Sequence, residues 1–502
     1  MEYKITDTGA HIPRPGGIGL VLFNRDTAKW GLFYLGLYLL IYGVFLHGRD
    51  WYLNIDEIRD YTVGNNTWEL YLSNGRWGLA LYRTVFQGLA PLGGVLIAGV
   101  WYAAALLLQT HLMGIKSSFC KAMYGAIALS VPLLGHHLLF ANQADAVGLG
   151  MLLSTLAVWA VGDKRPKILF TGAVCLAVAL AIYQSLLLNF AVLSMAMFYL
   201  QSLRCNTLRL RHHAWACTAV LIPALLLYAG VTYAGKAIIP ISEHIQQHTA
   251  MYQSALFAPE ADMSHTHIIL QFAENSLLSP KLLMLMLGVG LPLSFCTGAI
   301  AAVLLLPAAT NHGITRTQRA LRILLPICIL ATPFFICTCS HLPDNDPALV
   351  RTYTAAPWAC AALWVAAAEY YRAEVRLLLR RGLVCVTGFL VLYACYDCGK
   401  MHKEAQAFYS KFIRDYILIE HEAARLAAEH TGSKQSPRVL LFGGEELSPF
   451  DDFSSHPFVT SLHLPTAQER AAHSTTATSM PLWPAAGALR YVGNNTVIVH
   501  YR

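Results

Sequence analysis

Long apolar stretches alternate with short polar segments along the first 396 residues of this chain. A helix needs about 17–25 mostly apolar residues to cross a bilayer, and eleven stretches approach or exceed that length. The pattern therefore predicts a mainly α protein, a polytopic transmembrane bundle of about 11 spans over 1–396. The stretches fall at about 30–46, 85–110, 123–140, 146–162, 168–184, 185–202, 214–232, 282–306, 323–340, 355–371 and 382–396.

The pattern changes in the remaining residues, 397–502. Residues Glu404 to His430 have the spacing of an amphipathic helix, Arg438 to Gly443 read as a buried strand, and Asn494 to Tyr501 read as another. This mixture of elements predicts a small α/β C-terminal domain.

The composition agrees with a membrane protein, because 56% of the residues are hydrophobic and only 13% are charged, against about 25% charged in soluble domains. The first thirty residues lack the short apolar core and small-residue cleavage site of a signal peptide. We therefore expect the stretch at about 30–46 to remain as a membrane helix.

Basic residues alternate between the two sets of connecting segments. One set, beginning with the amino-terminal segment, holds nineteen Lys and Arg against five acidic residues, and the opposite loops hold seven against twelve. By the positive-inside rule the amino terminus is cytoplasmic. An odd number of spans then places the C-terminal domain outside. The net charge of +7 follows from this topology and is not read as a nucleic-acid signal.

Three outer regions are large enough to carry chemistry, namely 47–84, 233–280 and the C-terminal domain. The first contains an acidic cluster with an arginine: Asp56, Glu57, Arg59 and Asp60. If 54–62 is helical, Asp56, Arg59 and Asp60 share one face. The cluster fits a solvated helix start, or a site in which a carboxylate takes a proton from an attacking hydroxyl and an arginine holds a phosphate.

An aromatic stretch follows the acidic cluster and ends at Trp77. Its composition is typical of a helix that lies on the outer leaflet before the chain re-enters the membrane. His136 and His137, toward the outer end of the third span, are expected to face the bundle interior or a wet cavity. Asn142, Gln143 and Asp145 form a short outer turn.

Other outer positions are weaker candidates. Tyr183 and Gln184 either touch a sugar or close their hairpin, and Arg351, in a proline-bounded loop, is a second candidate for a phosphate contact. Cys395 and Cys398 lack further ligands nearby, which favours a disulfide or two free thiols over zinc. No metal site and no cofactor is predicted.

An acidic pair followed by Arg59, then a Trp and Asn74-Gly75-Arg76-Trp77 before the second span, resembles the Gtr-type (GtrII-like) O-antigen glucosyltransferases of bacteria. The usual family pattern is similar to Asp-Asp-x-x-Arg, then Gly and Trp, then Gly-Arg-Pro. Here the second acid is Glu57, and Trp77 stands in place of the frequent proline.

The resemblance implies a GT-C-like fold in the bacterial inner membrane, with a periplasmic C-terminal domain and the active site in the first outer loop. It implies transfer of glucose from a polyprenyl-phosphate donor such as undecaprenyl phosphate glucose to a surface glycan, the O-antigen of lipopolysaccharide, as in serotype conversion. A single displacement would invert the anomeric centre, and a divalent metal is not required. Asp56 or Glu57 would be the general base, and the donor phosphate or substrate would be bound by Arg59, Asp60, Arg76, Trp77, Tyr183, Gln184 and Arg351.

Two other functions fit a polytopic protein with charged outer loops. An O-antigen polymerase or ligase would favour a very large late outer loop rich in arginine, whereas 233–280 holds only Lys236 before its end. A lipid-linked sugar flippase would carry ionisable residues at mid-membrane depth, and the predicted spans have almost none.

Overall fold

The computed structural model is mainly helical, and it describes residues 25–46, 67–86, 91–130, 133–138, 141–163, 165–204, 210–241, 290–309, 315–334, 354–370, 378–431, 437–443, 462–463, 472–473, 476–481 and 488–501. The longer helices are α2 (Arg25–Tyr42), α4 (Thr67–Ser73), α5 (Trp77–Val85), α6 (Pro91–Leu112), α7 (Ser118–Leu129), α8 (Leu133–Leu138), α9 (Ala141–Asp163), α10 (Pro166–Ile182), α11 (Leu186–Arg204), α12 (Leu210–Ile238), α16 (Gly290–Leu304), α17 (Arg316–Ala331), α19 (Ala356–Tyr370) and α20 (Leu378–Thr431). The 3-10 helices are η1 (Gly43–Leu46), η3 (Leu306–Ala309) and η4 (Thr332–Phe334).

Each of the eleven apolar stretches overlaps at least one described helix. Within the described residues, six helices are long and apolar enough to cross a membrane: Asp26–Leu46, Gly94–Leu112, Gln143–Asp163, Leu186–Arg204, Leu210–Ile238 and Arg381–Lys403. Helices α7 and α10 are apolar but shorter. The chain is therefore a helical membrane protein, and the count of eleven spans stays a prediction.

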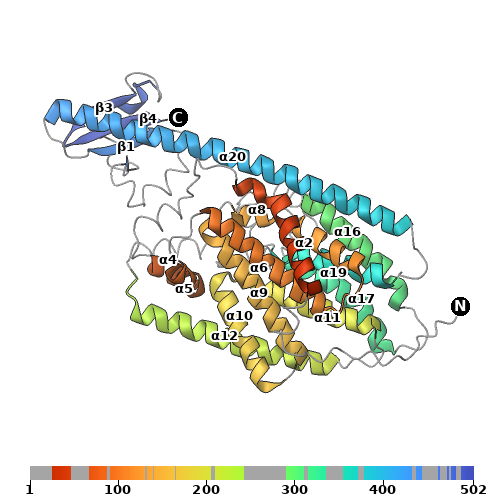
Figure 1. Ribbon diagram of the computed structural model, residues 1–502. Helices are drawn as coiled ribbons and strands as arrows, with labels where there is room; N and C mark the ends of the chain where they lie inside the picture. The colour runs from red at the N-terminus through yellow and green to blue at the C-terminus, as the bar shows by residue number, and fades with distance from the viewer. Residues whose placement is uncertain are drawn as a thin grey trace, which may run out of the picture. The chain divides into compact units, whose positions relative to one another are not determined.

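Two predictions about where helices begin and end are wrong. The single helix expected over 123–140 is two helices, α7 and α8. The sequence between them contains Pro132, and proline disfavours a continuous helix. The last span and the amphipathic helix after it, expected as separate elements, are instead the one helix α20 (Figure 1). The intervening Gly399 costs only about 1 kcal/mol relative to alanine, and no proline interrupts the segment.

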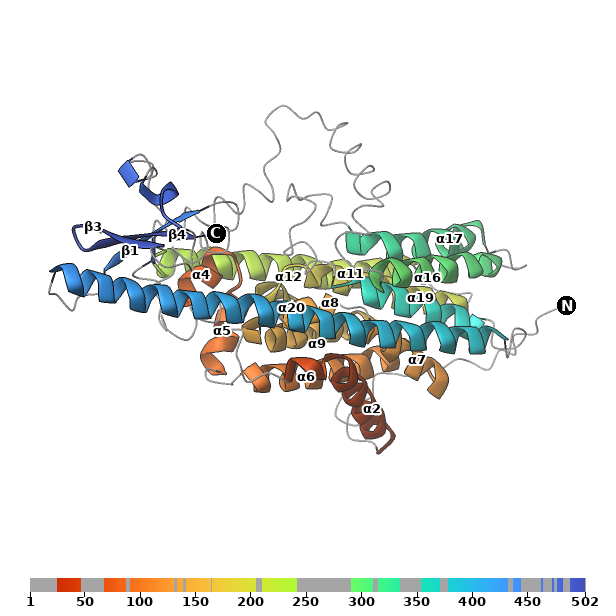
Figure 2. The ribbon, with the colours of Figure 1, turned by 90° about the horizontal axis from the view of Figure 1, so that it is seen from above.

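The chain divides into two compact units, one of Met1–His47 with Trp68–Met401 and one of Gly48–Thr67 with His402–Arg502. In the first unit, α6 packs along α9, α9 along α10, and α10 along α12 (Figure 1). Helix α2 packs on α6, and α11 contacts α9, α17 and α19. Helices α16, α17 and α19 form a neighbouring group (Figure 2). The first unit is thus a bundle in which α9 and α11 contact several other helices.

Helix α2 is anchored by tyrosines spaced four residues apart, so that they share one face. Tyr34, Tyr38 and Tyr42 are all buried. Their hydroxyls donate to the carbonyl oxygens of Lys121 (3.1 Å), Val95 (3.2 Å) and Leu129 (2.6 Å). A buried hydroxyl needs a partner in an apolar interior, and these bonds tie α2 to α6 and α7.

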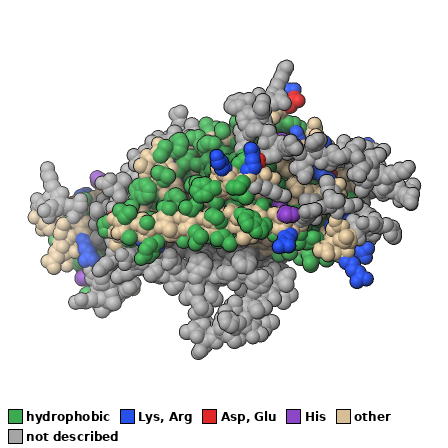
Figure 3. All heavy atoms as spheres, turned by 90° about the horizontal axis from the view of Figure 1, so that it is seen from below, with side chains coloured by type: hydrophobic (Ala, Val, Ile, Leu, Met, Phe, Trp, Pro, Cys, Tyr) green, Lys and Arg blue, Asp and Glu red, His purple; other side chains and the backbone are tan. Residues whose placement is uncertain are grey.

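Apolar side chains also cover much of the described surface on the face that Figure 3 shows. Trp215, Leu226 and Tyr233 on α12 are exposed, as is Phe170 on α10. An exposed apolar surface of this extent would be unfavourable in water. It fits helices whose outer faces contact lipid.

The second unit contains a four-stranded sheet in the order β2-β1-β4-β3, built from β1 (Arg438–Gly443), β2 (Leu462–His463), β3 (Leu489–Gly493) and β4 (Thr496–Tyr501). Strand β1 is parallel to β2 and β4, while β3 is antiparallel to β4. The turn between β3 and β4 places Asn494 and Asn495 at φ 48° and 52°, a conformation that asparagine tolerates well. The two strands predicted from the sequence are confirmed as β1 and β4, whereas β2 and β3 were not predicted.

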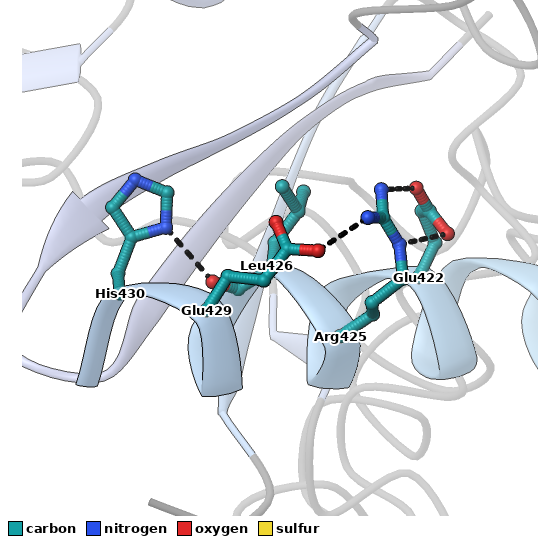
Figure 4. A network of polar contacts seen from close by, with 5 residues as sticks. All are labelled: Glu422, Arg425, Leu426, Glu429 and His430. Carbon is teal, nitrogen blue, oxygen red and sulfur yellow. Dashed lines mark hydrogen bonds and ion pairs between the residues drawn. The ribbon is translucent and has the colours of Figure 1, made fainter. Parts of the chain in front are cut away.

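The last turns of α20 carry an exposed charge network (Figure 4). The guanidinium of Arg425 pairs with the carboxylates of Glu422 and Glu429. The hydrogen bond from Arg425 lowers the pKa of Glu422 below its ordinary value, and the same contact raises the pKa of Arg425. His430, at the end of the network, stacks on Tyr491 of β3 with ring centroids 4.8 Å apart.

Candidate functional site

The residues predicted to form the site divide into two groups. Arg76, Trp77, Tyr183 and Gln184 are described by the structure. The acidic cluster Asp56, Glu57, Arg59 and Asp60, together with Arg351, lies outside the described residues. The geometry of the site is therefore built from the first group and its neighbours.

A tight turn joins α4 to α5 and presents Arg76. The Gly75 N–H donates to the Leu72 carbonyl at 2.9 Å, and the Arg76 N–H donates to the Tyr71 carbonyl at 2.6 Å. Gly75 has φ +71°, a left-handed conformation that glycine adopts without strain. The helix expected through Trp77 is therefore present but ends at Ser73, and Arg76 is the residue before α5.

The Arg76 guanidinium lies over the ring of Tyr183, with Cζ 5.1 Å from the ring centroid. Tyr183 follows the last residue of α10, where the predicted hairpin to α11 is confirmed. The buried His137 of α8 meets the same ring edge-on, with centroids 5.3 Å apart. Tyr183 thus contacts one side chain from the first outer region and one from α8.

Gln184 connects three segments of the chain. Its Nε2 donates to the Asn74 carbonyl at 2.7 Å and to the Tyr228 hydroxyl of α12 at 3.2 Å. A Cβ atom on Gly75 would lie 2.4 Å from that hydroxyl. The turn at 74–76, the hairpin and α12 therefore meet at one point.

The hairpin also contacts the segment after Arg351. Thr354 is the first described residue of that segment. Its hydroxyl lies 3.3 Å from the Ser185 hydroxyl and accepts a hydrogen bond from Asn189 Nδ2 at 3.3 Å. Buried polar contacts of this kind fix how the segment approaches α11.

Three nitrogen atoms at the two ends of α5 are buried without a partner in the described part of the chain. The Nε atoms of Arg76 and Arg83 and the indole Nε1 of Trp77 are buried, and none has a hydrogen-bond partner among the described residues. Nitrogen donors that lack an acceptor are costly in a folded protein. Two of these donors belong to adjacent residues, Arg76 and Trp77, at the start of α5.

A buried ion pair lies at the other end of α5. The Arg83 guanidinium contacts the Asp145 carboxylate near the start of α9, and the Tyr82 hydroxyl donates to the same carboxylate at 3.0 Å. Burial, with the Asp145 charge next, raises the pKa of Tyr82, so its hydroxyl stays protonated and donates. Asp145 is fully buried.

The Arg83–Asp145 ion pair was not predicted, although the sequence contains a signal for it. Arg83 and Asp145 both come just before predicted spans that start at the outer face. Opposite charges at the same membrane depth are expected to pair, because an unpaired one is costly. Tyr228 lies inside an apolar helix with no comparable signal.

Metal ligands are not grouped in the part of the chain that the structure describes, since no set of three or more His, Cys, Asp or Glu side chains there could hold an ion. Cys395 and Cys398 are free thiols. The Cys395 Sγ lies 3.6 Å from the Leu40 carbonyl oxygen of α2. Of the two arrangements left open for this pair, the structure has the free thiols.

Comparison with protein families gives one result. A family model described as Glucosyl transferase GtrII matches residues 48–357, which is more than half of the 502 residues. The matched segment contains every predicted site residue. No curated protein and no solved structure matches the chain.

Proposed function

This chain belongs to the GtrII glucosyl transferase family, and from that premise we propose the donor, the acceptor and the chemistry. As a family member it is a membrane glycosyltransferase that moves glucose to a glycan. We propose that the donor is a polyprenyl-phosphate-linked glucose and that the acceptor is a surface glycan such as O-antigen. A lipid-linked donor suits an outer site, because nucleotide sugars are cytoplasmic.

The observation that carries the proposal is the contact of Arg76 with Tyr183, next to Gln184. These residues lie more than a hundred positions apart in the sequence, yet the fold brings them together. A guanidinium matches a phosphate in charge and shape, and one that lies over an aromatic ring is held there by the attraction between the cation and the ring face. An arginine held in this way suits the phosphate of a lipid-linked sugar.

The proposed reaction is a single displacement. A carboxylate, Asp56 as first choice and Glu57 as second, takes the proton of an acceptor hydroxyl as its oxygen attacks the anomeric carbon. The bond from that carbon to the phosphate oxygen breaks, and the polyprenyl phosphate leaves with the electron pair. Arginine stabilises the developing charge. Attack from the opposite face inverts the anomeric centre.

The other predicted residues would assist binding. Arg76, Arg59 and Arg351 are proposed to contact the donor phosphate. Trp77, with Tyr183, Gln184 and Asp60, would contact sugar.

The test uses the purified protein in lipid nanodiscs, with radiolabelled polyprenyl-phosphate glucose and lipopolysaccharide as substrates. We expect the double variant Asp56→Ala/Glu57→Ala to lose transfer by at least about 100-fold, and the more damaging single variant to identify the base. Asp50→Ala, in the same outer region but outside the cluster, is the matched control. Full activity in the double variant rules out the proposed base.

A second measurement addresses the phosphate. Arg76→Ala should raise the donor KM by about tenfold or more, while Arg76→Lys, which keeps the charge, should raise it less. Transfer from a nucleotide sugar at the rate of the lipid-linked donor would contradict the proposal.

A further inference from the structure

Helix α5 is fixed to the bundle near its beginning. A Cβ atom on Gly78 would lie 2.9 Å from Ala181 Cβ and 3.0 Å from the Val178 carbonyl oxygen. These distances leave no room for any side chain at this position. The first turn of α5, which begins one residue after Arg76, therefore packs directly on α10.

The other end of α5 is fixed to α9. Both oxygens of the Asp145 carboxylate are used: Oδ2 accepts from the Tyr82 hydroxyl at 3.0 Å and from Arg83 Nη1 at 3.5 Å, and Oδ1 accepts from Arg83 Nη2 and from the Ala146 N–H. The carboxylate is fully buried, and the Arg83 side chain is only 14% exposed. Two consecutive residues of α5 thus bind one carboxylate.

A buried ion pair contributes little net stability, because removing both charges from water offsets their attraction. Its fixed geometry is a stronger reason for its presence, since a fork of two nitrogens on two oxygens permits one orientation. Helix α5 spans only nine residues from Trp77 to Val85. A constraint at its end therefore also restrains Arg76, one residue before its start.

We propose that Asp145 is a positioning residue for glucosyl transfer: through Tyr82 and Arg83 it holds α5, and with it Arg76, in the orientation that binds the donor phosphate. The proposal rests on the proposed function for the identity of that ligand. That Asp145 holds α5 in place does not depend on the proposed function, so the two parts of the proposal are tested separately.

The first experiment measures backbone hydrogen exchange of the whole protein in nanodiscs, without substrate. Asp145→Asn should speed exchange over residues 79–85 by about tenfold or more, because the broken pair releases α5. The matched control is Asp163→Asn, the same change at the other end of α9, where the partner Arg165 is exposed. Unchanged exchange over α5 in Asp145→Asn, or an equal change in the control, overturns the constraint.

The second experiment measures donor KM and kcat with lipid-linked glucose. Asp145→Asn should raise the donor KM about tenfold, with a smaller change in kcat, and should add less than about twofold when Arg76 is already alanine. A merely structural role would lower activity equally in both backgrounds, and that result overturns the proposal. If Asp145→Asn does not fold, Tyr82→Phe and Arg83→Lys, which weaken the same contacts, take its place.

The two experiments separate the two ideas. Faster exchange in α5 together with no effect of Arg76→Ala on donor KM would leave the constraint intact and refute the phosphate assignment. Unchanged exchange with a strong effect of Arg76→Ala would refute the positioning role and leave the proposed function standing.

Discussion

Gly75 is the residue whose replacement should have the clearest effect. Its φ of +71° costs other residues about 1 kcal/mol, and a Cβ there would lie 2.4 Å from the Tyr228 hydroxyl. We expect Gly75→Ala to lower the free energy of unfolding by about 1–3 kcal/mol and to reduce transfer. Thermal unfolding in detergent and the nanodisc assay measure the two effects.

The steric and backbone parts of this effect can be separated. Tyr228→Phe removes the atom nearest to the new methyl group, so the double variant should recover part of the loss, whereas the backbone part should remain. Gly230→Ala on α12, with no atom within 4 Å of its Cβ position, is the control. A Gly75→Ala protein as stable as the wild type would show that the turn has another conformation.

Outer location selected Tyr183 and Gln184 as site candidates, and the resemblance over Asn74-Gly75-Arg76-Trp77 selected Arg76. Their contacts could not be predicted, because the position of Arg76 over the Tyr183 ring depends on where α10 ends relative to α5. Tyr228 was missed because a tyrosine inside an apolar helix has the same pattern whether it packs in the core or closes a site.

The sequence pattern of α20 predicts two helices, whereas the structure has one continuous helix. The sequence changes from apolar to amphipathic between the last predicted span and Glu404, and this change was read as a boundary. A helix accommodates apolar and amphipathic segments alike, and neither of these segments contains a proline. A change of surroundings along a helix is therefore not a break in it.

Gly399 provides a test of this continuity. It lies inside α20 with no atom within 4 Å of its Cβ position. Gly399→Ala should raise the free energy of unfolding by about 0.5–1 kcal/mol, and Gly399→Pro should lower it by about 3 kcal/mol. Gly78→Ala, where the methyl group meets Ala181, should destabilise instead. A destabilising Gly399→Ala would place a break at this position.

The charge network at the end of α20 predicts a pH dependence. Since Arg425 lowers the pKa of Glu422 below its ordinary value of 4.5, the stabilisation is present above that value and is lost as the pH falls through the lowered value. Hydrogen exchange over 418–431 should be faster in Glu422→Gln than in wild type at pH 7, and the difference should vanish at acidic pH. Ala424→Gln is the control, and a difference that persists in acid would contradict the pairing.

For the whole molecule, the charge alternation predicts opposite locations for the two termini. A reporter that is active only in the periplasm should be active when fused after Arg502 and inactive when fused before Met1, and a cytoplasmic fluorescent reporter should give the reverse result. Two termini on the same side would require an even number of spans and would reverse the proposed location of the second unit.

The bundle was predictable in outline because each apolar stretch carries its own signal. Its packing was not, since the bonds from Tyr34, Tyr38 and Tyr42 join segments more than fifty residues apart. The sheet shows the same limit. Strand β1 was recognised locally, but its parallel pairing with β4 depends on contacts across nearly sixty residues.

The Arg83–Asp145 pair also implies an order of assembly during synthesis. Arg83 is synthesised 62 residues before Asp145. A charged side chain without a partner does not enter the hydrocarbon of the membrane readily. We therefore expect α5 to stay at the aqueous surface while α6 and α7 insert, and to pack against α9 only after α9 has been synthesised. A chain stopped before Ala141 should leave α5 open to a soluble protease that the full chain resists, so a prematurely terminated chain would be recognisable to quality control.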